Sequence, residues 1–540
     1  MNGLTGTVPL TRLALRRDRI NLPVWLLGLA GFTAATTAMS ATGFPTNEDL
    51  LQATRLMATS PGMRLTGLAS GASVGGYAMI RDYVTLAVLA ALMSTFAMVR
   101  HTRQSEETGR AEVVGAAVVG RHAELAAALI FTVAADVVLA ALIGLAMVAN
   151  GQPAAGSFTA GAAVGAAGLA FTGVAAVAGQ LASSSRGASG LSAAVLGVAF
   201  LTSGVGNMLG RADPSGLRVD SAWPVWLSPI GWGQQMRPFG GDHWWPVLLS
   251  LAALFAGVAA AALLTARRDV GHGMLPQRRG HDRAGRLLHG PAGLAWRLQR
   301  GAFAGWAVGM LGFGLVLGAV IGQMTELTGA ARDWYARLGG SGQMLDAYRA
   351  SMAQMAGMAV AIYVVQVLLR MRHEEADGPL EPVLATAVSR WRWVASHVLV
   401  ALSGAVVLLL LFAVGMGLAA GAVLGDPYGQ TSTLLRAGLV QLPGTLVVAA
   451  IVVAAVGLLP RAAAAVSWTL LMAAVLLGPL FGPTLRLPQW AQDLSPFTHI
   501  PKAPAAPVTA AAVLALVCTA AVPAAIGTAV LRRRNLALPT

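Results

Sequence analysis

The stretch LALRRDRINLPVWLLGLAGF, Leu13–Phe32, joins a basic segment to an apolar run, and a related stretch, LAWRLQRGAFAGWAVGMLGF, occurs at Leu294–Phe313. Eight of the twenty positions are identical when the two are aligned without gaps. The apolar run in each continues far enough to cross the hydrocarbon core of a membrane as a helix, which takes about 20 residues. A repeated start of this kind indicates two similar membrane-spanning halves.

Apolar runs of this length recur along the 540 residues, of which 56% are hydrophobic and 11% charged. They predict an all-α polytopic membrane protein with about twelve transmembrane helices in two parallel six-helix repeats. The expected spans are 22–42, 76–99, 122–149, 156–182, 189–209 and 244–265, then 301–322, 355–372, 396–423, 435–458, 464–484 and 507–531. The predicted domains are a first six-span half, 1–265, a cytoplasmic Arg-rich linker ending in an interfacial helix, 266–300, and a second six-span half, 301–540.

The formal net charge of +14 is distributed as a topology signal and not as a nucleic-acid surface. With the N-terminus inside, most of the 37 Lys and Arg residues fall in inner segments, as the positive-inside rule requires. We therefore expect a plasma-membrane protein with both termini cytoplasmic and no nucleic-acid partner. The basic stretches before the two first spans, Thr11–Asn21 and Leu294–Arg300, suit helices at the inner interface with arginines near lipid phosphates. A simple positive flank is the alternative.

Two residue counts bound the chemistry. The single cysteine, Cys518, excludes an intrachain disulfide and cysteine-based metal or redox motifs, and no metal site is expected. The single lysine, Lys502, follows Pro501 and no Gly-rich loop, so a Walker A phosphate-binding loop is absent from the sequence. The chain is not expected to hydrolyse ATP or to hold a cofactor of its own.

Two charged segments occupy the same place in the two halves, between the second and third spans. They read RHTRQSEETGRAEVVGAAVVGR (100–121) and RMRHEEADGPLEPVLATAVSRWR (370–392). Each has a glutamate pair, a glycine, a third glutamate and a small-apolar run that ends in arginine. The run at 112–121 predicts a short helix, whose acidic start and basic end suit the helix dipole. The residues concerned are Glu106, Glu107, Gly109, Arg110, Glu112, Arg121, Glu374, Glu375, Gly378, Glu381 and Arg390.

These segments resemble the first intracellular loop of type-2 ABC exporter permeases, and SPIGW and SPFTH before the last span of each half resemble the outer Ser-Pro motif of that family. The fused twelve-span organisation resembles an actinobacterial subgroup of polyketide and ionophore antibiotic exporters. The resemblance implies coupling helices that dock on two copies of a separate ABC nucleotide-binding protein, which binds ATP and Mg. The second copy departs from the first by an extra residue at Asp377–Gly378 and by Pro379 in place of Arg110. An ordinary solvated loop is the alternative, although it does not explain the repeated glutamates.

Other residues are candidates for the transport path and its outer opening. Asp136 lies near the middle of the third span, where a carboxylate either contacts substrate or a gating partner, or fixes helix packing. Met352, Met355 and Met358 recur at three-residue spacing and suit either varied apolar ligands or ordinary packing. An interfacial aromatic belt or an outer lid would explain four residues near the last spans: Trp226, Pro229, Trp232 and Pro496.

The leading hypothesis is therefore the permease subunit of an ATP-driven ABC exporter that moves hydrophobic or amphipathic compounds out of the cell. A secondary transporter, proton-coupled through Asp136, also suits twelve spans in two parallel halves. A membrane scaffold that transports nothing is the third possibility. The paired charged loops favour the ABC hypothesis.

Overall fold

The computed structural model describes residues 3–44, 46–59, 61–64, 67–267, 273–274, 285, 288, 290–322, 344–376, 378, 380–479, 482 and 487–535. The chain forms two compact helical units, Met1–Arg279 and Gly280–Thr540. Within the described ranges, eleven helices are long and apolar enough to cross a membrane, and one shorter apolar helix, Ala463–Leu477, accompanies them. The expectation of an all-α polytopic membrane protein is confirmed.

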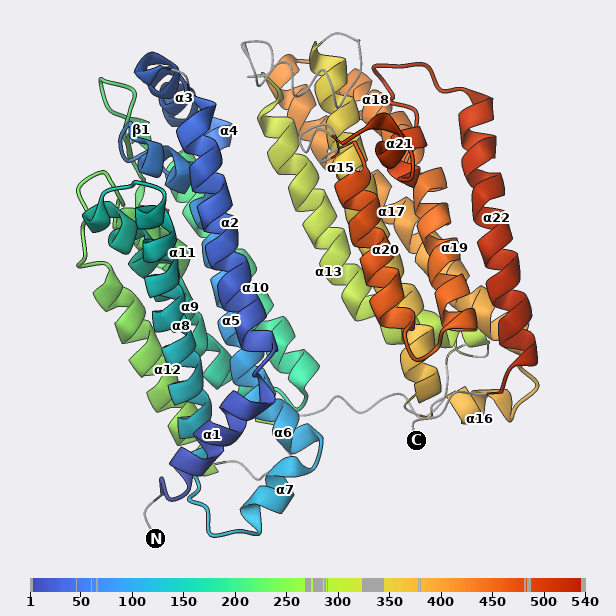
Figure 1. Ribbon diagram of the computed structural model, residues 1–540, viewed down its shortest axis with the longest axis horizontal. Coiled ribbons are helices and arrows are strands. Elements are labelled where there is room, and N and C mark those ends of the chain that lie inside the picture. The colour runs from blue at the N-terminus through green and yellow to red at the C-terminus, as the bar shows by residue number, and fades with distance from the viewer. Residues whose placement is uncertain are drawn as a thin grey trace. The chain divides into compact units, whose positions relative to one another are not determined.

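The first unit is a bundle of long helices with short elements at both ends (Figure 1). Its long helices are α2 (Asn21–Gly43), α5 (Val74–His101), α8 (Ala123–Ala149), α9 (Ala154–Leu181), α10 (Ser185–Met208) and α12 (Val247–Arg267). One end carries α1 (Thr7–Arg17), α6 (Arg103–Glu107) and α7 (Arg110–Gly115). The other carries α3 (Asn47–Thr59), α4 (Pro61–Arg64), the hairpin of β1 (Arg211–Ala212) and β2 (Val219–Asp220), η1 (Trp223–Leu227) and α11 (Pro229–Gln235).

The second unit has a similar order of helices. Its long elements are α13 (Pro291–Ala319), α15 (Met344–Ala376), α17 (Arg390–Leu424), α18 (Pro427–Leu439), α19 (Leu442–Leu458), α20 (Ala463–Leu477) and α22 (Ala510–Arg533). The short elements are α16 (Leu380–Leu384), α21 (Gln489–Gln492) and η4 (Pro496–His499). We call the end of each unit that carries α7 or α16 the charged-loop end.

Small residues let the central helices of the first unit pack closely. Helix α9 is rich in Ala and Gly and is buried over most of its length. A Cβ atom added at Gly161 would lie 2.1 Å from the carbonyl oxygen of Ala140 on α8, so only glycine allows the two backbones to approach this far. Such small-residue contacts are typical of helices packed in membranes, where dispersion contacts replace the hydrophobic driving force.

The helix boundaries depart from the predicted spans in three places. The predicted span 435–458 lies in a longer helical segment, which is interrupted between α18 and α19 just before Pro443. The predicted span 464–484 is represented by the 15-residue α20, and its end lies partly outside the described residues. The predicted span 355–372 is the middle of the 33-residue α15. Most of the predicted linker 266–300 also falls outside the described residues.

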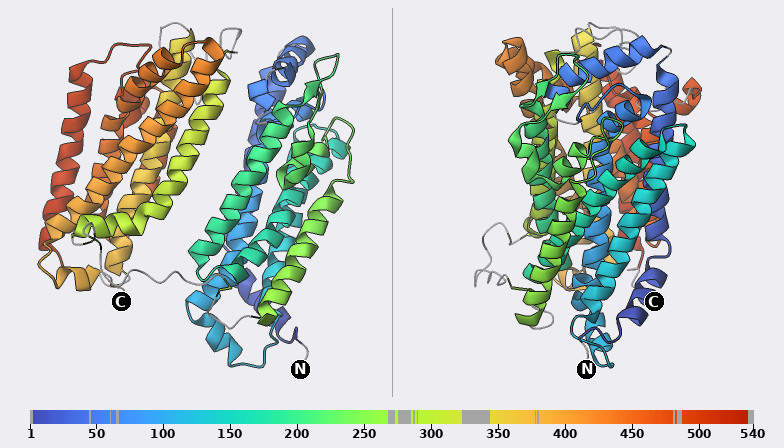
Figure 2. Two further views of the ribbon diagram at one scale, coloured as in Figure 1. Left: turned by 180° about the vertical axis from the view of Figure 1, so that it is seen from behind. Right: turned by 90° about the vertical axis from the view of Figure 1, so that its left-hand side faces the viewer.

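The basic stretches before the first spans form helices in both units. In the first unit α1 is separate from α2, with Asp18 at its C-cap. In the second unit Leu294–Arg300 belongs to the start of α13, which bends before it runs along the bundle (Figure 2). The two units differ here because a turn separates α1 from α2, whereas α13 is one continuous helix. Their placement at a lipid interface stays a prediction.

Candidate functional site

The charged loop of the first unit begins with a buried ion pair. Arg103 Nη1 lies 2.6 Å from Glu106 Oε2, and the side chain of Arg103 is only 1% exposed. Arginine is almost never buried unless its charge is paired, so Glu106 neutralises it at the end of α5. Glu106 is therefore turned toward Arg103 of the same short helix instead of projecting outward.

Glu107 connects the charged loop to the next turn at the same end of the unit. Its Oε2 accepts hydrogen bonds from the backbone N–H of Ser185, at 3.0 Å, and from the Ser185 hydroxyl, at 2.5 Å. Ser185 is the first residue of α10, where unpaired N–H groups and the helix dipole favour a carboxylate. Glu107 thus fastens α6 to the start of the fifth long helix.

The outermost part of the first loop is α7. Gly109 precedes it with φ 73°, a left-handed conformation that suits glycine, and Glu112 lies in the first turn of the helix. Glu112 and Arg110 are exposed, and Val113 is 77% exposed, which is unusual for a valine. Exposed acidic, basic and apolar groups together make α7 the most accessible surface of the loop.

The predicted helix at 112–121 is shorter than expected. It ends at Gly115, and the chain then returns to the bundle through a segment with a turn and bends. That segment is fixed by the N-terminus, because Gly120 N–H donates to the carbonyl of Thr5 at 2.8 Å and His122 N–H to that of Gly3 at 3.0 Å. Arg121 is exposed at the end of it.

A cavity of about 200 Å³ lies between the first charged loop and the bundle. Val114 of α7, Arg121, Glu124 of α8 and Gln180 of α9 contribute to its wall. Close packing is the rule inside proteins, so a space of this size means that α7 is held by its ends and not by a packed inner face. The loop has room to shift toward the bundle.

The second charged loop repeats the backbone pattern of the first. Gly378 has φ 87°, and Glu381 follows it by three residues, just as Glu112 follows Gly109. Glu381 is exposed in the first turn of α16. Both units therefore present a glutamate after a left-handed glycine, although Asp377 and Pro379 themselves lie outside the described residues.

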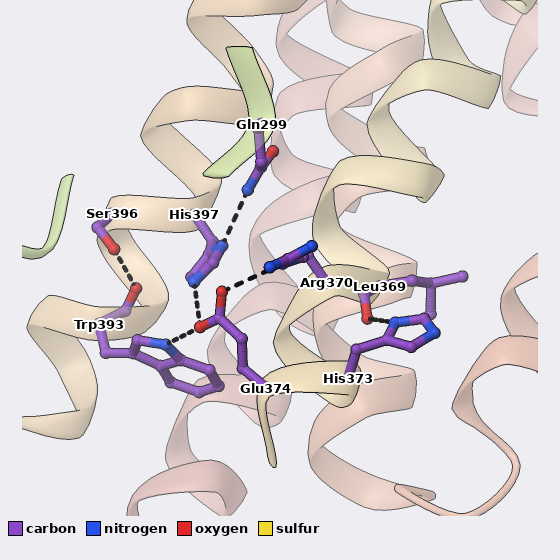
Figure 3. A network of polar contacts seen from close by, with 8 residues as sticks. All are labelled: Gln299, Leu369, Arg370, His373, Glu374, Trp393, Ser396 and His397. Carbon is purple, nitrogen blue, oxygen red and sulfur yellow. Dashed lines mark hydrogen bonds and ion pairs between the residues drawn. The ribbon is translucent and has the colours of Figure 1, made fainter. Parts of the chain in front are cut away.

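The glutamate pair of the second loop is buried. Its first member, Glu374, connects α15 to α17 and, through His397, to α13 (Figure 3). Glu374 Oε2 accepts a hydrogen bond from Trp393 Nε1 at 3.0 Å and contacts His397 Nε2 at 3.2 Å, both on α17. Glu374 Oε1 lies 3.5 Å from Arg370 Nε, and the other ring nitrogen of His397 meets Gln299 of α13 at 3.2 Å. Glu374 is thus the centre of a polar network inside the unit.

Glu375 is engaged by the end of the chain. Its two carboxylate oxygens lie 2.5 and 2.7 Å from the two terminal nitrogens of Arg534, and its side chain is 1% exposed. Arg390, the first residue of α17, donates to the carbonyls of Leu531 and Arg534 at 3.2 and 2.5 Å. These contacts attach the segment after α22 to α15 and α17.

The glutamates of the two loops therefore fall into two groups. Glu106, Glu374 and Glu375 pair with groups of their own unit, and the exposed Glu107 is hydrogen-bonded to Ser185, whereas Glu112 and Glu381 are exposed in the first turns of α7 and α16. The sequence pattern did not distinguish the two groups. A partner that approaches the charged-loop end would meet Glu112 and Glu381.

The Ser-Pro motifs have the same contacts in both units. Pro229 and Pro496 are the first residues of α11 and η4, and the preceding Ser228 and Ser495 are fully buried. The Ser228 hydroxyl donates to the carbonyl of Ala199 on α10 at 2.6 Å, and the Ser495 hydroxyl donates to that of Ala474 on α20 at 2.7 Å. Each serine oxygen also accepts a backbone N–H of the short helix that it begins. Each motif therefore fixes a short helix to the preceding span.

Asp136 is enclosed by three helices of the first unit and has no exposed surface. Its oxygens accept hydrogen bonds from the hydroxyls of Ser94 on α5, at 2.7 Å, and Thr172 on α9, at 3.0 Å. A Cβ atom added at Gly168 would lie 2.4 Å from Asp136 Oδ1. This geometry fits the packing alternative, because each carboxylate oxygen already has a partner on another helix.

The methionines and the tryptophans have different surroundings. Met352 and Met358 belong to the buried core of the second unit, and Met355 packs against it. Trp226 is 38% exposed, stacks on Trp245 with ring centroids 5.2 Å apart, and its carbonyl accepts a hydrogen bond from Trp232 Nε1 at 2.6 Å. The methionines fit ordinary packing. The roles of both groups in transport stay predictions.

The contacts of Asp18 with His101 and Arg100 were not identified from the sequence. Asp18, between α1 and α2, contacts His101 Nε2 at 2.7 Å and also pairs with Arg100. Burial raises the pKa of Asp18, but the hydrogen bonds from His101 and Arg100 outweigh it and bring this pKa to about 2. Gln299 occupies the position of Asp18 in the repeat and contacts His397. The presence of a polar residue at this repeat position in both halves, Asp18 and Gln299, could have indicated these contacts.

Similarity to known proteins covers the whole chain and, separately, its second unit. Residues 288–532 match the family model described as multidrug efflux system permease Rv1217c, C-terminal domain. The multidrug efflux system permease protein Rv1217c of Mycobacterium tuberculosis is 38% identical over 542 residues, which cover 99% of this chain and 96% of that protein. Together with the eleven membrane-spanning helices, this similarity shows that the chain is a multi-pass membrane protein that belongs to the Rv1217c family of multidrug efflux system permeases.

Proposed function

We propose that this chain is the membrane-spanning subunit of an ATP-driven exporter, in which a separate ATP-binding protein docks on the two charged loops. The observation that carries the proposal is the repeated arrangement of Gly109 with Glu112 and of Gly378 with Glu381. In each unit a glutamate is exposed in the first turn of the outer short helix, while other glutamates of the loop contact groups of the same unit.

Two loops of the same design call for two copies of the same partner, one for each unit. The partner would bind ATP and Mg, since the chain contains no Lys-containing phosphate loop. In this proposal the charged-loop end of each unit, and both termini, would lie in the cytoplasm of a cell whose plasma membrane the chain spans. The basic residues of α1 and of the last turn of α22 support that orientation.

The cargo would be hydrophobic or amphipathic compounds of the antibiotic and drug type. The name of the relative, a multidrug efflux system permease, supports this class. The spans offer mainly apolar side chains, which suit apolar cargo. Proton-coupled transport through Asp136 receives no support from a carboxylate that is enclosed and hydrogen-bonded on both oxygens.

The test is reconstitution. The chain alone should show no ATPase activity, whereas co-expression with its ATP-binding partner should yield a complex of one chain and two partner copies. ATP-dependent movement of a drug into inverted vesicles should require both proteins. ATP turnover by the chain alone, or a drug flux that follows a proton gradient without the partner, would overturn the proposal.

A further inference from the structure

A small cavity lies where α1, α6, α7 and α8 meet in the first unit. It has a volume of about 80 Å³. Arg17 from the end of α1 and Arg110 from the start of α7 line it together with the apolar side chains of Leu10 and Leu13. A water molecule takes about 30 Å³ in the liquid, so the space holds a group the size of a phosphate.

The charges around this cavity leave one positive charge in excess. Arg100 is paired with Asp18, which also contacts His101. Arg17 and Arg110 then face the single carboxylate of Glu124. Burial, followed by the positive charge of Arg110, lowers the pKa of Arg17, as expected for two guanidinium groups that repel each other. No salt bridge to either arginine is formed within the described part of the chain.

The second half of the sequence replaces both arginines. Leu298 occupies the repeat position of Arg17, and Pro379 occupies that of Arg110. Two neighbouring basic positions are kept, since Arg297 matches Arg16 and Arg300 matches Arg19, whereas Gly293 stands at the position of Arg12. Loss of both cavity arginines alongside retention of their neighbours indicates that the two act together and serve a purpose particular to the first unit.

We propose that this cavity binds the phosphate of an anionic phospholipid headgroup, held between Arg17 and Arg110. Arginine binds phosphate oxygens with two parallel N–H donors, and one phosphodiester charge would balance the excess positive charge. The surroundings favour a lipid over a soluble phosphate, because Leu13, which lines the cavity, is more than half exposed and can contact acyl chains, and Leu15 of the same helix is exposed as well. A bound headgroup would bridge α1 and α7, and so connect the membrane surface to the charged loop.

The experiment measures lipid binding by the full-length chain in a zwitterionic detergent, by native mass spectrometry. The probes are phosphatidylglycerol, phosphatidylcholine and inorganic phosphate. The Arg17→Gln/Arg110→Gln variant should bind phosphatidylglycerol roughly tenfold more weakly or worse, since hydrogen bonds to charged groups are among the strongest. The matched control, Arg12→Gln/Arg16→Gln, removes two charges from α1 outside the cavity and should lose only a few-fold.

A melting curve in phosphatidylcholine shows whether each variant is folded. If the glutamine variant is not, Arg17→Lys/Arg110→Lys keeps the charge and should retain partial affinity for phosphatidylglycerol. Equal losses for the cavity variant and the control would mean general surface electrostatics and would overturn the site. Displacement of the lipid by inorganic phosphate at matched concentration would overturn the assignment to a lipid. The inference does not depend on an ATP-binding partner, because no readout involves one.

Discussion

Reversal of the charge at Glu112 separates a docking role from a structural role of the first charged loop. Glu112→Arg changes an exposed residue of α7. Exposed substitutions usually alter stability by less than about 0.5 kcal/mol, and the loss of an acidic group from a helix start adds about 0.3–1 kcal/mol. We therefore expect the variant chain to fold and insert normally.

The expected effect on assembly is much larger. If Glu112 pairs with a basic group of the ATP-binding partner, removal of one side of that desolvated pair costs about 2–5 kcal/mol. Because about 1.4 kcal/mol corresponds to a tenfold change, association should weaken by roughly thirty-fold to several thousand-fold. The mirrored Glu381→Arg should act in the same direction on the second unit, where Gly378 presents the glutamate in the same way.

The assay combines co-purification with the partner, drug-stimulated ATPase activity, export into vesicles and the melting temperature of the chain alone. Glu48→Arg is the matched control, because Glu48 is also an exposed glutamate in the first turn of a short helix, α3, but at the opposite end of the unit. Normal assembly and export by both Glu112→Arg and Glu381→Arg, with the control also normal, would show that the loops are simply solvated.

Substitutions at five further positions test contacts that the structure assigns to the fold. Glu375→Gln leaves a buried guanidinium without its carboxylate and should destabilise the second unit by about 3–5 kcal/mol, seen as a lower melting temperature; an unchanged melting temperature would contradict the contact. Asp136→Asn should keep export and stability, whereas Asp136→Ala should lower the melting temperature; loss of export in a stable Asp136→Asn variant would restore the path hypothesis. Ser228→Ala and Ser495→Ala should each cost about 1–3 kcal/mol by leaving the backbone N–H of Gly231 or Phe497 without its acceptor, and they should do so to a similar degree in calorimetry. Asp18 has its pKa lowered to about 2, so its contribution of about 2 kcal/mol is complete above the ordinary pKa near 3.8 and is lost as pH falls toward 2. Asp18→Asn should flatten the melting temperature over that interval, and a wild-type curve without this slope would refute the assignment.

Much of the architecture could be predicted because membrane crossing imposes a length and a composition on each helix. The repeat of Leu13–Phe32 at Leu294–Phe313 identified the two halves, and Thr46 followed by Asp49 is a sequence pattern typical of a local cap, here at the start of α3. In that case the cap is local: Asp49 N–H donates to the Thr46 hydroxyl at 3.2 Å. Patterns of this kind are readable because their cause lies within a few neighbouring residues.

Tertiary contacts decide whether each charged side chain is exposed or is buried with a partner. Glu112 and Glu375 belong to the same repeated motif, yet one is exposed and the other meets Arg534, 159 residues further along the chain. Asp136 likewise acquires its role from Ser94 and Thr172 on two other helices. Hydropathy and helix length are properties of a segment, so the amino-acid sequence alone determined the spans. Burial of a carboxylate depends on which donors the folded helices bring within about 3 Å, and only the tertiary structure supplies that distance.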